Sequence, residues 1–153
     1  KLSQSIIELN LIAPLFVSQA VNSIMQSQQA GGSIVNISSV SVIRPSPGAA
    51  AYGSAKSGLA NLTESLAIEW APKVRVNNIL SGLVETEESI IHYGSKDSIN
   101  KISETIPLKR MGKPKDIGNS CLFLCSSLAE YISGASLLVH GGGESPSYHN
   151  AKE

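Results

Sequence analysis

Residues 32–56, GSIVNISSVSVIRPSPGAAAYGSAK, decide the fold of this 153-residue chain. Residues 33–38 are rich in β-branched side chains and predict a short buried strand. Residues 44–48 contain proline, serine and glycine and predict a loop. Residues 50–71 are strong helix formers with apolar side chains at helical spacing, so they predict a helix. The stretch is therefore expected to form a strand, a loop and a helix.

The flanking residues continue this alternation. Apolar residues at helical spacing predict a helix over residues 4–28, which Pro14 should kink because it lacks an N–H donor. Strands that alternate with helices indicate an α/β fold, with a parallel sheet and right-handed crossovers, in one domain over residues 1–153. The other predicted elements are strands over residues 74–80 and 136–140, a polar flap over residues 81–103 and a helix over residues 114–126.

Composition narrows the partners. The formal net charge is zero, because 12 basic residues balance 12 acidic ones, so no general attraction to nucleic acid is expected. Apolar runs such as residues 11–17 are too short to span a membrane, so no membrane is expected either. The histidines are scattered, and Cys121 and Cys125 are expected to be small core residues, so no metal is predicted. These features suggest an intracellular protein.

Tyr52 and Lys56 are the strongest chemical signal in the chain. They are four residues apart in a predicted helix, so both side chains lie on one face, one turn apart. A free phenol has a pKa of about 10 and is a poor proton shuttle at neutral pH. A neighbouring ammonium group favours the phenolate and brings proton transfer into working range. The spacing therefore predicts an acid/base pair.

The residues that follow the predicted strands extend this site. Ser39 follows the first strand, and Gly82 and Thr86 follow the second. Ligands of parallel α/β sheets bind beyond the carboxyl ends of the strands. The Ser39 hydroxyl can polarise a carbonyl oxygen to which Tyr52 delivers a proton. Gly82 would let the backbone approach a bound ring, and the Thr86 hydroxyl can bond an amide. Together these positions predict carbonyl chemistry.

Further motifs run in order through nearly the whole chain: Asn10-Leu11, Gly32 to Ser39, Tyr52-x-x-x-Lys56, Val76-Asn77, Gly82-x-Val84-x-Thr86, Arg110 to Ile117, Phe123-Leu124 and Gly141-Gly142. In this order and spacing they resemble the classical branch of the short-chain dehydrogenase/reductase family. The resemblance implies a Rossmann-like doubly wound parallel sheet. It is partial here, because residues 1–153 lack the N-terminal phosphate-binding strands and their glycine-rich turn.

The resemblance also implies a role for each matched residue. Tyr52 would be the general acid/base, Lys56 would favour its phenolate and bind the nicotinamide ribose, and Ser39 would orient the substrate oxygen. Asn10 would hold a water molecule that links Lys56 to solvent. The cofactor would be NAD(P), with NADPH expected over NADH. The residues expected to line the nicotinamide, besides Tyr52 and Lys56, are Ile37, Ser38, Ser81, Gly82, Val84 and Thr86, with Thr86 near the carboxamide.

Some positions depart from the family pattern. Ser81 stands where a proline usually precedes the glycine, which loosens this loop, and His140 replaces a common aspartate. The chain begins at Lys1 and continues directly into a helical pattern, so we expect a piece of a longer protein. Such a piece would leave the strand at residues 33–38 with an unpaired edge. Alone, it is expected to bind cofactor poorly and to associate.

A finer resemblance concerns the trans-2-enoyl-CoA reductase subgroup, which reduces acyl-CoA double bonds with NADPH and is often peroxisomal. It depends on residues 66–71, 92–95 and 147–149. The expected substrate is therefore a small carbonyl compound or an acyl-CoA, and the expected location is cytoplasmic or peroxisomal. A 3-oxoacyl or alcohol dehydrogenase of the same family is the first alternative. A truncated, inactive chain that acts by association is the second. Family resemblance implies a homodimer or homotetramer, with the first two long helices at the interface.

Overall fold

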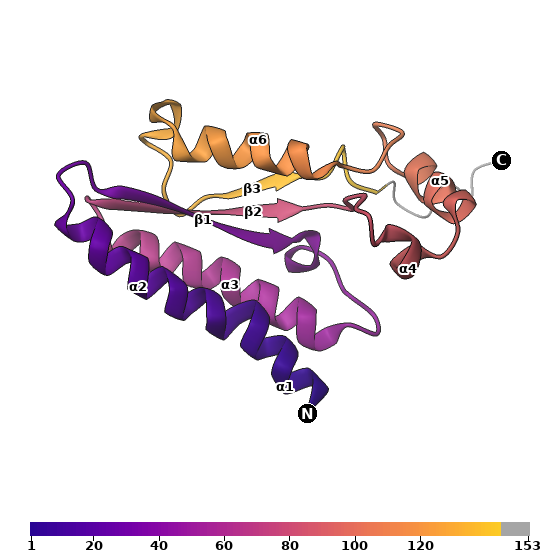
Figure 1. The fold of residues 1–153 in the computed structure, drawn as a ribbon, viewed down its shortest axis with the longest axis horizontal. Coiled ribbons are helices and arrows are strands. Elements are labelled where there is room, and N and C mark those ends of the chain that lie inside the picture. Colours follow the sequence, from indigo (N-terminus) through magenta and orange to yellow (C-terminus); the bar gives the residue numbers. More distant parts are fainter. Residues whose placement is uncertain (145–153) are drawn as a thin grey trace.

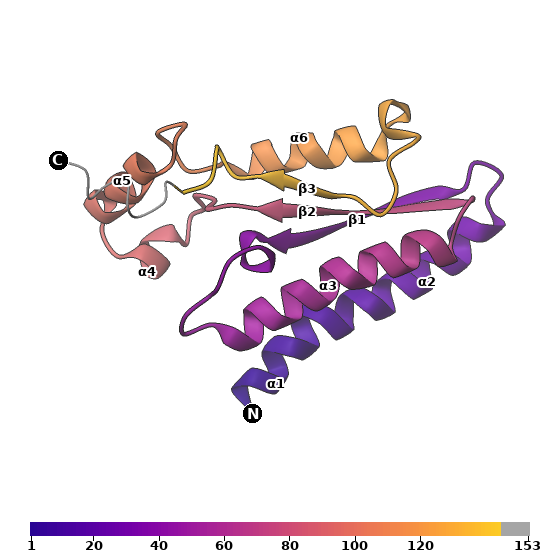
Figure 2. The same cartoon turned by 180° about the vertical axis from the view of Figure 1, so that it is seen from behind.

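The computed structural model describes residues 1–144 and has three layers. A parallel sheet with strand order β1-β2-β3 has α1, α2 and α3 on one face and α6 on the other (Figures 1 and 2). The predicted α/β fold with a parallel sheet is therefore confirmed. The strands are β1 (Gly32–Ser39), β2 (Val74–Ser81) and β3 (Ser136–Val139).

The helices follow the predicted order along the chain. Short helical turns are expected within the predicted flap, and the chain forms two separate helices there; the second, with 10 residues, is longer than a single turn. The helices are α1 (Leu2–Ile7), α2 (Ala13–Ser27), α3 (Ala50–Glu69), α4 (Ser89–Tyr93), α5 (Lys96–Thr105) and α6 (Pro114–Cys125), with short 3-10 turns η2 (Val40–Val42) and η3 (Ser127–Ala129).

The first long helix is irregular at a different place from the one predicted. A π-helix, η1 (Glu8–Ile12), joins α1 to α2, so the irregular turn comes before Pro14. Pro14 itself lies in the first turn of α2. Because proline has no N–H to give to the carbonyl four residues earlier, the preceding turn loses an α-helical hydrogen bond. The wider π turn accommodates the missing hydrogen bond. Such turns are frequent at functional sites.

The core lies between the sheet and α3. Val74 and Val76 of β2 are buried together with Leu66 of α3, and Leu59 of α3 is 1% exposed. Burial of each such side chain stabilises the fold by about 1.5–3 kcal/mol. A hydrogen bond of 2.9 Å from Asn36 Nδ2 to Thr63 Oγ1 also joins β1 to α3 inside this layer. These contacts hold the helix with the predicted acid/base pair in a fixed position on the sheet.

The flap has its own small core at the carboxyl end of the sheet. Ile99, Ile106 and Met111 are buried together, and Leu83, which follows β2, packs against them. A parallel bridge between Val84 and Gly112 ties the start of the flap to the segment before α6. The flap is therefore packed as a unit beside the strand ends, where Figure 1 shows α4 and α5.

The outer face of the first helical segment is apolar. Leu9, Phe16 and Ile24 are 71%, 64% and 61% exposed. By length and composition alone, residues 2–27 are also apolar enough to cross a membrane, since an 18-residue window within them has a mean hydropathy of 1.2, although helices of water-soluble proteins pass the same test. The sequence analysis considered only shorter runs, so its expectation of no membrane stays a prediction.

Other sequence expectations have mixed outcomes. Within the described residues, β1 pairs only with β2, so it is an edge strand as predicted. The expectation that both cysteines are core residues is wrong, because Cys125 is exposed and Cys121 only partly buried on α6. The four-residue spacing of the two cysteines places them on one face of α6 but does not say whether that face packs against the sheet. The 147–149 motif lies outside the described residues.

Candidate active site

The carboxyl ends of β1 and β2 meet at the edge of the sheet where the site was predicted. The two strands are in register, so Ser39 lies opposite Ser81. Ser81 Oγ donates to the carbonyl of Ser38 at 3.0 Å, and Gly82 N donates to the carbonyl of Val139 at 2.9 Å. The hydroxyl at Ser81 therefore links the two strand ends, which a proline at that position could not do.

Lys56 joins α3 to the end of β1. Its Nζ donates to the carbonyl of Ile37 at 2.9 Å, and in return Ser38 Oγ donates to the carbonyl of Lys56 at 3.1 Å. The Lys56 Nζ lies 5.7 Å from the centroid of the Tyr52 ring, as expected for residues one turn apart. Two hydrogen bonds in opposite directions thus fix the helix turn that carries both residues.

The surroundings of Lys56 act on its charge. The side chain is half-buried, and burial lowers its pKa from the ordinary lysine value because the ammonium form loses hydration. The hydrogen bond to Ile37 uses one N–H of the ammonium group, which carries three. The remaining donors are free to bind hydroxyl groups of a ligand, since no other protein partner is found for them among the described residues.

Ser39 is buried at the end of β1, where the chain turns into η2. Its Oγ accepts a hydrogen bond from Ser41 N at 3.2 Å and donates to Ser41 Oγ at 3.1 Å. The Ser39 proton must leave Ser41 before it can serve a substrate oxygen. Ser41 is thus a neighbour of the predicted site that sequence reasoning missed, because two-residue spacing in a serine-rich loop carries no specific signal.

Asn10 lies within the π-helix η1, and its Nδ2 donates to the carbonyl of Ile6 at 3.0 Å. This segment is closely packed on α3, because a Cβ on Gly58 would lie 3.0 Å from a methyl carbon of Leu11. Pro14 lies four residues after Asn10 and cannot donate to its carbonyl. The structure therefore places Asn10 at an irregular helical turn against the helix that carries Lys56.

The other predicted cofactor residues differ in their exposure. Ile37 is 41% exposed, whereas Ser38 is 2% exposed and its hydroxyl is already bonded to α3. Thr86 N donates to Ser89 Oγ at 2.8 Å, which fixes the loop before α4. Gly82 is closely packed, since a Cβ there would lie 2.7 Å from the Cβ of His140. The backbone at position 82 therefore lies so close to His140 that only glycine fits there.

A cavity of about 430 Å³ opens beside these strand ends. We call it the strand-end cavity. It begins at Val40, the residue after Ser39, and its wall combines the end of β1, the loop after β2, the flap and the segment after β3. Its principal side chains are Val40, Ile43, Arg44, Leu83, Ile106, His140 and Glu144. The wall is mainly apolar, and its charged groups are Arg44 and Glu144, which form an ion pair.

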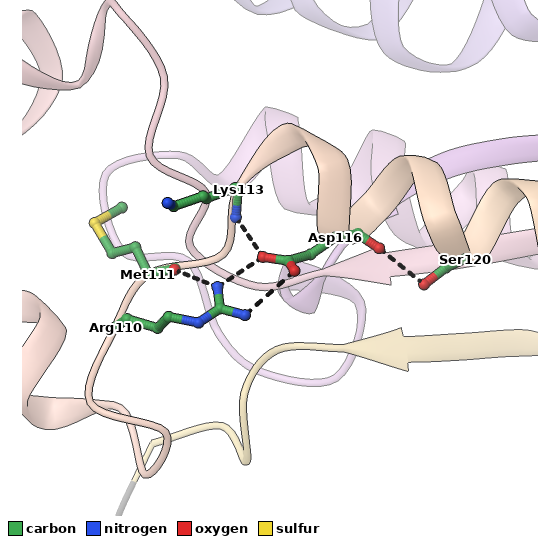
Figure 3. Close-up of polar contacts among 5 residues, drawn as sticks. All are labelled: Arg110, Met111, Lys113, Asp116 and Ser120. Carbon is green, nitrogen blue, oxygen red and sulfur yellow. Dashed lines mark hydrogen bonds and ion pairs between the residues drawn. The ribbon is translucent and has the colours of Figure 1, made fainter.

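The start of α6 is fixed by an ion pair beside the strand ends (Figure 3). Arg110 donates to both carboxylate oxygens of Asp116, at 2.7 and 3.2 Å, and the backbone N of Lys113 donates to Asp116 Oδ2 at 2.7 Å. These hydrogen bonds, first that from Arg110 and then that from Lys113, lower the pKa of Asp116 to about 2. The matched family motif from Arg110 to Ile117 is therefore structural here.

Known proteins support the same family. The family model described as enoyl-(acyl carrier protein) reductase matches residues 2–144. The chain is 38% identical over 137 residues to dehydrogenase/reductase SDR family member 4 of Homo sapiens, covering 89% of this chain and 49% of that protein. It is 40% identical over 141 residues to 3-oxoacyl-acyl-carrier-protein reductase FabG of Aquifex aeolicus, covering 91% and 55%. The chain thus spans about half the length of the curated relatives it matches.

Solved structures are also similar. A 4-hydroxyisoleucine dehydrogenase mutant complexed with NADH and succinate has a TM-score of 0.83 at 33% identity, over 92% of this chain and 58% of that one. The ligand-free aldohexose dehydrogenase of Thermoplasma acidophilum has a TM-score of 0.85 at 30% identity, also over 92% and 58%.

Proposed function

The chain belongs to the short-chain dehydrogenase/reductase family, and on that premise we propose that it carries the catalytic residues of an NAD(P)-dependent oxidoreductase. Its substrate would be a small carbonyl compound, or the corresponding alcohol in the reverse direction. One observation carries the proposal. Lys56 is hydrogen-bonded to Ile37 near the end of β1 and lies one helical turn from Tyr52, at the same end of the sheet as the strand-end cavity, whose wall begins at Val40.

The side chains would divide the work as follows. The phenolic oxygen of Tyr52 would give a proton to the substrate oxygen as negative charge develops there. Lys56 would stabilise the resulting phenolate, because it is a half-buried cation on the same helical face. The Ser39 hydroxyl would rotate from Ser41 to donate to the same substrate oxygen. Asn10 would connect Lys56 to solvent through water, which would restore the proton on Tyr52.

The residues present are compatible with a nicotinamide group. Exposed Ile37 offers an apolar surface, Gly82 leaves no side chain in the way, and Lys56 keeps N–H donors for ribose hydroxyls. Ser38, Ser81, Val84 and Thr86 would hold the backbone of the two loops that face the ring. When bound, the nicotinamide supplies the hydride.

The finer identity of cofactor and substrate rests on the family resemblance and on the named relatives. NADPH is our first choice of cofactor, from the resemblance to trans-2-enoyl-CoA reductases, while two structural neighbours are described as complexed with NADH. An enoyl thioester is the substrate implied by that same resemblance and would place the activity in fatty acid metabolism, in the cytoplasm or peroxisome. A 3-oxoacyl or alcohol substrate is the alternative, and relatives named as reductases and dehydrogenases favour it.

Titration of the protein that carries this chain with NADPH and NADH, followed by calorimetry, tests this proposal. Saturable micromolar binding supports it, and a screen with carbonyl and enoyl-CoA compounds then identifies the substrate class. If that protein is folded and binds neither nucleotide, the proposal is contradicted; the isolated chain is itself expected to bind only weakly. Lys56→Met is the matched variant, because it removes the donor to the ribose and should weaken binding.

A second candidate function is association with another copy of the chain. The observation that favours it is the apolar outer face of the first helical segment, which carries Leu9, Phe16 and Ile24. We infer a homodimer or homotetramer that buries this face against the same helices of another copy, as the family resemblance implies. Sedimentation of Phe16→Glu against the unmodified chain tests it, because a buried carboxylate should dissociate the assembly.

A further inference from the structure

Among the described residues, the mainly apolar wall of the strand-end cavity includes one strongly basic side chain, that of Arg44. Arg44 lies in the loop after η2, five residues beyond Ser39, and its guanidinium group forms an ion pair with Glu144. Both residues line the cavity, together with apolar Ile43 and Ile106. The side chains of Arg44 and Glu144 are 37% and 48% exposed, so the pair faces the cavity and solvent and is not sealed in the core.

Glu144 reaches Arg44 because of the backbone after β3. Gly141, Gly142 and Gly143 all have positive φ values, of 66°, 97° and 82°. A Cβ on Gly142 would lie 2.8 Å from the ring of Pro107, so the turn is also packed tightly against the flap. Glycine is needed for both the conformation and the contact. The chain thus bends back over the cavity and brings the Glu144 carboxylate to Arg44. Among the described residues that line the cavity, Arg44 is the only arginine.

The ion pair is suited to exchange. An exposed pair of this kind contributes little net stability, because solvent screens both charges. The planar guanidinium group binds any carboxylate with the same two-pronged geometry. A carboxylate of a ligand inside the cavity could therefore replace that of Glu144 at small cost. The apolar remainder of the wall would contact a short carbon chain.

We propose that Arg44 is a specificity-determining residue that selects substrates with a carboxylate group, and that the Glu144 carboxylate holds the position on Arg44 that the substrate carboxylate would take. The inference rests on the proposed function, since it places the reacting carbonyl at Ser39 and Tyr52 and the carboxylate at Arg44. The substrate class is then a short keto acid. Reduction adds a hydride from the nicotinamide to the carbonyl carbon and a proton from Tyr52 to its oxygen, which yields a hydroxy acid and the oxidised nucleotide.

Levulinate and methyl levulinate form a matched probe pair, because both carry the same ketone and only the acid carries a charge. Binding of each to the protein that carries this chain is measured by calorimetry or ligand-observed NMR, which requires no cofactor. Levulinate should bind at least about tenfold more tightly than its ester, as a charge-assisted hydrogen bond to arginine provides. Arg44→Met should remove this preference. Glu144→Gln should tighten levulinate binding severalfold, because the competing carboxylate is gone.

Lys101→Met is the control, since Lys101 is an exposed cation of α5 that pairs with Asp97 away from the cavity. It should leave the preference intact. Equal binding of acid and ester, acid binding that survives Arg44→Met, or no saturable binding of levulinate would each overturn the inference. Turnover on the same samples separates the two proposals. Reduction of neutral ketones without an acid preference leaves the proposed function standing, whereas Arg44-dependent acid binding without any reduction contradicts the proposed function alone.

Discussion

Thr63→Val tests how α3 is held on the sheet. The Thr63 side chain is fully buried, accepts a hydrogen bond from Asn36 Nδ2 at 2.9 Å and donates to the carbonyl of Leu59 at 2.9 Å. Valine has the same shape but no hydroxyl, so the Asn36 amide loses its acceptor. An unsatisfied buried donor costs about 1–3 kcal/mol, and the added methyl group offsets about 0.8 kcal/mol of this. The free energy of unfolding should therefore fall by about 0.2–2.2 kcal/mol, with about 1 kcal/mol at the middle of the range.

Urea unfolding followed by circular dichroism measures this change, as a lower midpoint with an unchanged slope. Ser65→Ala is a suitable control, because the exposed Ser65 hydroxyl bonds only within its own helix. A double-mutant cycle with Asn36→Leu isolates the pair and should give a coupling of about 1 kcal/mol. A Thr63→Val variant as stable as the unmodified chain, or strictly additive effects, would refute the view that this hydrogen bond holds α3 to β1.

Three further predictions concern the site and its frame. Gly82→Ala should lower the free energy of unfolding by about 1–3 kcal/mol in urea titrations, because its Cβ would lie 2.7 Å from that of His140 and the backbone must move; full stability would show that the loop is loose. Lys56 should titrate below other lysines in an NMR titration, since burial lowers its pKa; a resonance that titrates with the exposed lysines would contradict this. Asp116→Asn should lower the thermal midpoint at neutral pH. Because the folded pKa of Asp116, about 2, lies below the ordinary 3.8, its contribution is complete above 3.8 and disappears as the pH falls toward 2. A difference between Asp116→Asn and the unmodified chain that stays constant down to pH of about 2 would contradict that account.

Local patterns predicted the regular elements well. Residues 33–38 and 74–80 are β-branched runs between turn formers, and they form the core of β1 and β2. The four-residue spacing of Tyr52 and Lys56 likewise places them on one turn of α3. Such features depend on near neighbours in the chain, so the sequence alone contains the information.

Contacts between distant segments could not be predicted in the same way. The Arg44–Glu144 pair joins residues that only the glycine turn after β3 brings together. The π turn at Asn10 arises from Pro14. The spacing of apolar residues is the same for a kink at the proline and for a widened turn before it, so the sequence does not distinguish them. Cys125 is exposed because nothing among the described residues covers that part of α6. Each of these outcomes depends on what packs against the segment, which its own residues do not reveal.

Carbonyl reduction by the protein that carries this chain, compared between the unmodified form and Tyr52→Phe, tests the central claim most directly. Loss of reduced nucleotide absorbance reports turnover, and calorimetry on the same samples reports cofactor binding. Removal of the phenolic hydroxyl should lower turnover by about 10²–10⁴-fold, as expected for a general acid, while the cofactor binds with nearly unchanged affinity. Ordinary turnover by Tyr52→Phe would contradict the assignment of Tyr52 as the proton donor, and with it the proposed site.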